Sequence, residues 1–113
     1  MIPKTEEKLE KEYERCKKSF VAVNKESYIH YKNEAYSDLQ SAEKDESSKW
    51  AITKAYQSLF LMCNALLVKN LGSYSKDHSC IIIALLKNNI LTKETLDKIN
   101  SMLKEREKNV KRI

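Results

Sequence analysis

The sequence predicts an all-α protein that forms a single domain over residues 1–113. The chain holds one glycine and one proline, whereas average usage would give roughly eight and six. Turns and sheet bulges draw on these two residues, so we expect few connections. Charged residues make up 33% of the sequence, as suits helices that keep one face in water. Apolar residues also recur at helical spacing along five segments.

The first predicted helix covers about residues 5–20. Thr5 is a suitable N-cap, and two glutamates follow it in the first turn, where the helix dipole favours acidic groups. Its apolar face is narrow, so we expect this helix to dock on another element. Residues 20–27 either continue the helix or form a bend. The apolar face consists of Leu9, Tyr13, Cys16 and Phe20.

The second predicted helix covers residues 27–45. Two of its apolar residues, Ala35 and Ala42, are small and would allow a neighbouring helix to approach closely. Its apolar face consists of Tyr28, Tyr31, Ala35, Leu39 and Ala42.

The third predicted helix covers residues 48–71. It is apolar around most of its circumference, which predicts a central and buried position. Ser47 or Ser48 can cap its start, and Gly72 suits the left-handed position that follows its end. Its longest apolar stretch, residues 55–68, is interrupted by polar residues and is too short to span a bilayer, so we expect no membrane contact.

Two more helices are predicted in the last third of the chain. Residues 77–87 include CIIIALL, whose three isoleucines alone would favour a strand. We interpret this segment as a helix, because no second strand candidate exists to pair with it. A fifth helix is predicted after Thr92, with an apolar face of Leu96, Ile99, Leu103 and Val110 on which Arg106 also falls.

The three cysteines, Cys16, Cys63 and Cys80, lie far apart in the chain. Their odd number and the lack of a C-x-x-C motif do not indicate a disulfide framework. Cys63 and Cys80 fall in apolar runs, where a thiol serves as a small hydrophobic group. We therefore expect a reducing, cytoplasmic setting. The charged N-terminal stretch is not expected to be a signal peptide.

The positive charge is concentrated in the second part of the sequence. Residues 1–46 hold nine Lys/Arg and eleven Asp/Glu, a net charge of −2, whereas residues 47–113 hold twelve and five, a net charge of +7. A basic region of this kind raises the possibility of a polyanionic partner, RNA or nucleotide. The alternative is a solvated, lysine-rich face, since only three of the basic residues are arginines.

Three stretches occur in a recognisable order: YSDLQSAEKD, then KWAITKAYQSLFLMCNALLVKNLG, then KDHSCIIIALL. They are similar to a D-L-x-x-A segment, a helix of the pattern A-Y-Y-A-x-F-x-x-x-x-A-L-L, and a K-x-H-S loop. In this order they resemble the HEPN domain family, especially its small standalone prokaryotic members, over about residues 28–110. The matching residues are Asp38, Leu39, Ala42, Ala55, Tyr56, Phe60, Ala65, Leu66, Leu67, Lys76, His78 and Ser79.

The resemblance implies an antiparallel helical bundle that forms a homodimer. It also implies a role with RNA or nucleotides in a toxin–antitoxin or defence system, beside a small nucleotidyltransferase partner. Many family members are metal-independent ribonucleases whose signature is an Arg followed, about four to six residues later, by a His. In such a pair the His moves a proton and the Arg holds the phosphate.

This sequence departs from the ribonuclease signature. Its arginines are Arg15, Arg106 and Arg112, its histidines are His30 and His78, and no His follows an Arg at the family's spacing. The sequence therefore favours a non-catalytic or degenerate HEPN module that binds RNA, nucleotide or a partner protein. The alternative is a metal-independent ribonuclease with an atypical site built from Arg106 and His78.

Five residues are candidates for binding, and three of them have a specific structural alternative. His78 contacts a phosphate or base, or it makes a local hydrogen bond while a neighbour caps the following helix. Arg106 lines a groove, or it packs its stem and extends its head into water. Tyr56 presents its hydroxyl to a pocket, or it belongs to the core. The five candidates are Arg106, His78, Lys76, Tyr56 and Lys49.

No metal site or cofactor is expected. Glu34 and Asp38 lie one helical turn apart, but two carboxylates without a further grouped ligand do not make a metal site, so a solvated face is the better interpretation.

A homodimer is also predicted from the amount of apolar surface. Residues 28–71 carry more apolar and aromatic side chains than five short helices can cover in one small domain.

Overall fold

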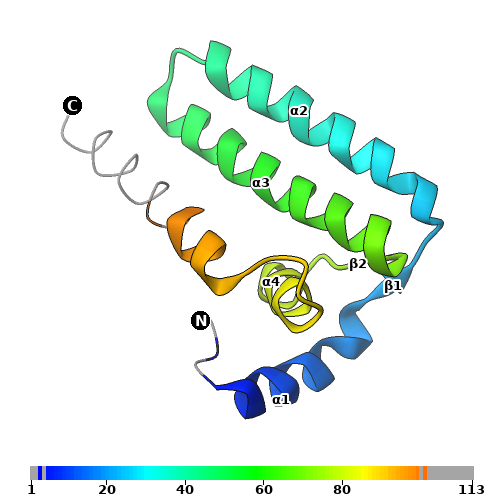
Figure 1. Cartoon of the computed structure of the whole chain (residues 1–113). Coiled ribbons are helices and arrows are strands. Elements are labelled where there is room, and N and C mark those ends of the chain that lie inside the picture. Colours follow the sequence, from blue (N-terminus) through cyan, green and yellow to red (C-terminus); the bar gives the residue numbers. More distant parts are fainter. Residues whose placement is uncertain (1–2, 4, 100, 102–113) are drawn as a thin grey trace.

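The computed structural model describes residue 3, residues 5–99 and residue 101, and its architecture is all-α as predicted (Figure 1). Helix α2 (Tyr28–Lys44) begins within one residue of its predicted start, and α3 (Ser48–Leu71) matches its predicted range. Residues 93–99 form the fifth helical segment. Leu103, Arg106 and Val110 of the predicted fifth helix lie outside the described residues. The helices are α1 (Glu6–Cys16), α2 (Tyr28–Lys44), α3 (Ser48–Leu71) and α4 (His78–Lys87), with short 3₁₀ helices η1 (Lys17–Ser19) and η2 (Lys25–Ser27).

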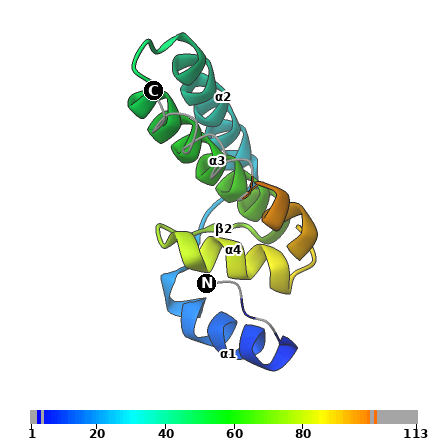
Figure 2. The same ribbon diagram turned by 90° about the vertical axis from the view of Figure 1, so that its left-hand side faces the viewer.

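The helices form layers. Helices α2 and α3 lie side by side and antiparallel, and α4 crosses beneath α3 (Figures 1 and 2). Helix α1 lies on the side of α4 that faces away from α3. Helices α2 and α3 pack closely because α2 places small residues against α3. Ala35 and Ala42 are buried, and the Ser58 hydroxyl donates a hydrogen bond to the Ala35 carbonyl at 2.6 Å.

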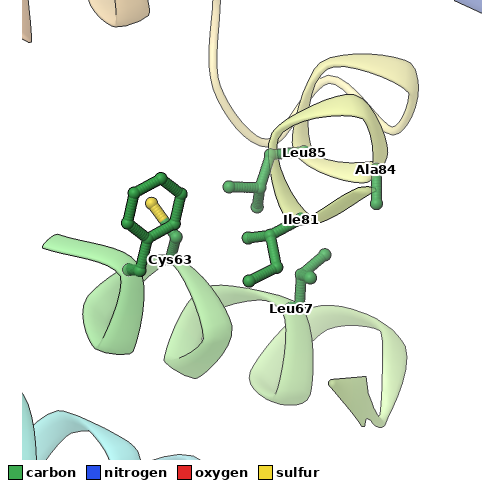
Figure 3. Packing of buried hydrophobic residues seen from close by; sticks show 6 residues of the cluster. Cys63, Leu67, Ile81, Ala84 and Leu85 are labelled. Atoms are coloured by element: carbon green, nitrogen blue, oxygen red, sulfur yellow. The ribbon is translucent and has the colours of Figure 1, made fainter. Parts of the chain in front are cut away.

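The main core lies between α3 and α4 (Figure 3). CIIIALL is helical, as predicted, because Asp77 caps the helix: its Oδ1 accepts a hydrogen bond from the Cys80 amide at 3.2 Å. Gly72 has a φ of 66° and ends α3 in the left-handed conformation that glycine tolerates. The buried residues of this core are Phe60, Cys63, Leu67, Ile81, Ala84 and Leu85.

The expectation that no cysteines pair was wrong. Cys16 at the end of α1 and Cys80 in the first turn of α4 form a disulfide, and both residues are about 1% exposed. The two cysteines are separated by 64 residues, so their pairing depends on how α1 docks on α4. No local sequence pattern indicates it. Cys63 is the free cysteine of the described residues and is buried.

Of the two alternatives predicted for residues 20–27, the continued helix was wrong. The α-helix ends at Cys16, and residues 21–22 form strand β1 (Val21–Ala22) instead of continuing a helix. This strand pairs in antiparallel register with β2 (Ser73–Tyr74), so that Val21 lies opposite Tyr74. Each strand has only two residues, too short for the sequence to show a strand pattern.

Helix α3 is buried along its second half but not along its first. Cys63, Leu67 and Val68 are buried, whereas Trp50 is 58% and Tyr56 is 43% exposed. The prediction of a buried circumference was therefore wrong for the first half, since α4 covers only the second.

Among the described helices, α3 alone is long and apolar enough to cross a bilayer, a test that core helices of soluble proteins also pass.

The predicted homodimer stays a prediction, and three exposed apolar side chains on α2 and α3 are where its interface is sought. Ile29 and Tyr36 on α2, and Trp50 on α3, are each at least half exposed, and such surface favours association. We expect light scattering at micromolar concentration to give twice the chain mass of 13.2 kDa. The mass of a single chain would contradict the homodimer.

Candidate binding cleft

A cleft of about 510 Å³ opens where α2, α3 and the loop before α4 meet. Clefts of this size hold small ligands in many proteins. We refer to it as the central cleft. Helix α2 contributes Tyr31 and Asp38, and α3 contributes Gln57, Phe60, Leu61 and Asn64. The third wall, which we call the loop wall, consists of Tyr74 from β2, Ser75 and Lys76 from the loop, and His78, the first residue of α4.

Aromatic rings form much of the central cleft. The His78 ring stacks on the Phe60 ring, with centroids 3.8 Å apart and planes inclined by 9°. Tyr56 meets Phe60 edge to face at 4.9 Å, and the rings of Tyr31 and Tyr74 lie 5.9 Å apart. Phe60 is buried while His78 is exposed, so the stack extends from the core to solvent. Such rings are suitable surfaces for a planar ligand.

Buried hydrogen bonds hold the loop in place. The Asn64 side chain donates to the Ser75 carbonyl at 2.9 Å and accepts from the Ser75 amide at 3.2 Å. The Ser75 hydroxyl accepts a hydrogen bond from the Asp77 amide at 3.1 Å. Because Asn64 and Ser75 are buried, these bonds fix the position of the residues between Tyr74 and His78.

Other polar side chains of the cleft are available to a ligand. Asp38, Gln57 and Lys76 make no side-chain hydrogen bond or ion pair with a described residue. Asp38 on α2 is acidic and Lys76 on the loop is basic, so the two walls differ in charge. Burial raises the pKa of Tyr31, and Tyr74 and Glu34 raise it further, so its hydroxyl stays protonated at neutral pH and can donate.

The structure brings together two of the five predicted site residues and places a third beside them. Lys76 and His78 line the cleft, and Tyr56 lies 6.2 Å from His78 between ring centroids. Lys49 is exposed and does not line it; eight residues before Gln57 on α3, it lies on the order of 12 Å away along the helix. Arg106 lies outside the described residues.

The structure shows the surroundings of His78 and Tyr56. Asp77 caps α4, as one alternative held, but His78 stacks on Phe60 and makes no local side-chain hydrogen bond with a described residue. Tyr56 is 43% exposed and so is not a core residue. Glu34 is exposed and lies 3.1 Å from His30, and Asp38 is half-buried and lines the open cleft.

Several lining residues carried little sequence signal. Gln57, Phe60 and Asn64 follow one another at helical spacing and so share a face of α3, which was the one available indication. Tyr31, Tyr74 and Ser75 come from distant segments that meet only in the folded chain.

Nucleophilic and metal chemistry have little support in the described residues. Burial raises the pKa of the Cys63 thiol to about 11, so Cys63 is not a thiolate at neutral pH. No group of three or more His, Cys, Asp or Glu side chains in the described part of the chain is arranged to hold a metal ion.

The helical fold and the central cleft define a small α-helical domain with a polar, aromatic-lined opening. The chain matches the HEPN domain over residues 28–110 and belongs to this family. No curated protein and no solved structure gave a significant match.

Proposed function

We propose that this chain is a non-catalytic HEPN module that binds single-stranded RNA or a nucleotide in the central cleft. The observation that supports the proposal is the stack of His78 on Phe60 at 3.8 Å beside the side chain of Lys76. A nucleotide needs a flat surface for its base and a cation for its phosphate, and these residues offer both within one opening.

The charges of the cleft suggest how the ligand lies. A phosphate is repelled by the Asp38 carboxylate and attracted by Lys76, so the phosphate belongs at the loop wall. The base then lies toward α2 and α3, where Gln57 and the protonated Tyr31 hydroxyl supply hydrogen-bonding groups. Stacking of one base on an aromatic side chain contributes about 1–3 kcal/mol, so the loss of one stack should raise the Kd by about fivefold or more.

Substitution of His78 and Lys76 is expected to weaken RNA binding in different ways. His78→Ala removes the exposed ring and should raise the Kd for a fluorescein-labelled single-stranded RNA by about fivefold or more, because base stacking is lost. His78→Phe keeps a ring and should retain most of the affinity.

Lys76→Ala should lower the slope of log K against log salt by about 0.7, because one phosphate contact disappears. Fluorescence anisotropy at several salt concentrations measures all three.

Lys11→Ala is the matched control for charge. Lys11 is an exposed lysine of α1, and its side chain is 75% accessible and remote from the cleft lining. Lys11→Ala removes the same charge as Lys76→Ala but should leave the Kd for the labelled RNA within about twofold of wild type. Equal losses in the two lysine variants would show that binding is a general effect of net charge and would contradict the proposed site.

Purified protein is expected to show no ribonuclease activity in the presence of a chelator, since no Arg and His stand at the family's spacing. The assay compares wild type with His78→Ala and Arg106→Ala on a labelled RNA. Cleavage that is lost in both variants would establish the alternative, an atypical ribonuclease. Cleavage that neither change affects would identify a contaminant.

A further inference from the structure

The N-terminal segment, residues 5–27, lies outside the residues that match the HEPN domain but contacts the loop of the central cleft. Strand β1 pairs with β2 and so holds Tyr74, a cleft residue. The Ser19 hydroxyl lies 3.1 Å from the Ser75 hydroxyl, and the Val23 amide donates to the Gly72 carbonyl at 2.9 Å. The N-terminal segment thus supports the cleft wall that carries Lys76 and His78.

A covalent bond joins the same two regions. Cys16 immediately precedes the 3₁₀ helix that contains Ser19, and Cys80 lies two residues after His78. The Cys16–Cys80 disulfide therefore ties the end of α1 to the first turn of α4, directly after the loop wall, while the β1–β2 pair ties the N-terminal segment to the start of the loop wall.

We propose that the Cys16–Cys80 disulfide is a redox-sensitive positioning bond for the central cleft. When it is intact, the N-terminal segment holds the loop wall in the binding geometry. When it is reduced, the loop wall loosens and the cleft loses affinity. This inference rests on the proposed function, because it names a regulation of the same site.

The reduction step needs a dithiol as the co-reactant. A thiolate of the dithiol attacks one cysteine sulfur, and the second dithiol sulfur resolves the mixed disulfide. The Cys16–Cys80 bond breaks, two electrons and two protons pass to the cysteines, and the dithiol becomes a disulfide. Since both cysteines are about 1% exposed, attack requires α1 to move away from α4.

Several contacts survive reduction: β1 stays paired with β2, Asn64 stays bonded to Ser75, and Tyr13 and Phe20 stay packed beside Ile83. The polar contacts between α1 and α4 are few. Glu10 and Lys87 form an ion pair at the surface, where such pairs contribute little. The Asn88 side chain donates to the Tyr13 hydroxyl at a long 3.4 Å. By contrast, α2 and α3 have their own packing and the Ser58–Ala35 hydrogen bond, which do not involve the N-terminal segment. We therefore expect the effect of reduction to be local to the loop wall.

The test compares oxidised wild type with protein reduced by dithiothreitol, with free thiols counted to confirm reduction. The Kd for labelled single-stranded RNA should rise about tenfold on reduction. Hydrogen exchange of amides in residues 73–80 should become faster, while exchange in residues 28–71 stays the same. Cys16→Ala/Cys80→Ala should behave as reduced wild type and not respond to dithiothreitol. Cys63→Ala should keep the wild-type response, because Cys63 is not in the disulfide.

Three results would overturn the proposal. An unchanged Kd together with unchanged exchange at 73–80 after confirmed reduction would show that the bond does not position the loop. A loss of helical circular dichroism on reduction would show global unfolding instead of a local effect. A dithiothreitol response that persists in Cys16→Ala/Cys80→Ala would place the sensitive group elsewhere. If neither redox form binds RNA, the proposed function fails, and the exchange measurement still decides whether the disulfide positions the loop.

Discussion

Removal of the Cys16–Cys80 disulfide is expected to lower the free energy of unfolding by about 4 kcal/mol, from the chain entropy that a closed loop removes from the unfolded state. The loop spans a sequence separation of 64 residues, which lies between the shorter and longer loops for which that relation gives about 3 and 4.7 kcal/mol. For a domain of this size the melting temperature should fall by on the order of 20 °C. Urea denaturation of Cys16→Ala/Cys80→Ala and of wild type measures the difference.

Wild type in dithiothreitol separates the covalent effect from the loss of two buried side chains. Reduced wild type keeps both sulfurs in place and should lose most of the same stability. Cys63→Ala, in contrast, should not change the response to dithiothreitol. If oxidised and reduced wild type unfold at the same urea concentration, the disulfide does not stabilise the protein.

Leu67→Ala is expected to lower the free energy of unfolding by about 2–5 kcal/mol, because it removes a buried side chain and leaves a cavity. Leu67 is 0% exposed and packs from α3 toward Ile81 and Leu85 of α4 (Figure 3). The rigid contact between two helices limits how far the core can collapse around the gap. Urea denaturation monitored by circular dichroism gives the value.

Leu71→Ala provides the matched control on the same helix. Leu71 is 39% exposed, so its truncation should cost about 0.5 kcal/mol or little more. Both variants remove the same atoms from α3 and have the same change in helix propensity. Equal losses would mean that helix propensity, and not burial against α4, sets the stability of α3.

The helices were predictable because their signals are local. Thr5 caps α1, Asp77 precedes α4, and Gly72 ends α3 in the left-handed conformation. Each of these residues acts on backbone groups within a few positions of itself. The sequence similarity to the HEPN domain depended on the same local patterns, and the family match over residues 28–110 confirms it.

The cleft was predictable only in part. Lys76 and His78 drew notice because they stand on a short loop between two strong helices. Asp38 was considered only as part of a solvated face, because no metal site was recognised around it. That it lines the same cleft as Lys76, which lies more than thirty residues later, depends on the tertiary structure. Asn64 looked like an interruption of an apolar helix, but its amide pairs with both backbone groups of Ser75.

The sequence by itself determined the all-α class, the bounds of the long helices and the family. These depend on periodicity and capping, which involve residues a few positions apart. Only the tertiary structure decided the Cys16–Cys80 disulfide, the β1–β2 pair and the stack of His78 on Phe60. The disulfide joins residues 64 positions apart, the strand pair joins residues more than fifty positions apart, and the stacked rings are 18 positions apart. They form because α4 docks on α3 and α1 docks on α4, an arrangement that is a free-energy minimum of the whole chain and that no short stretch encodes.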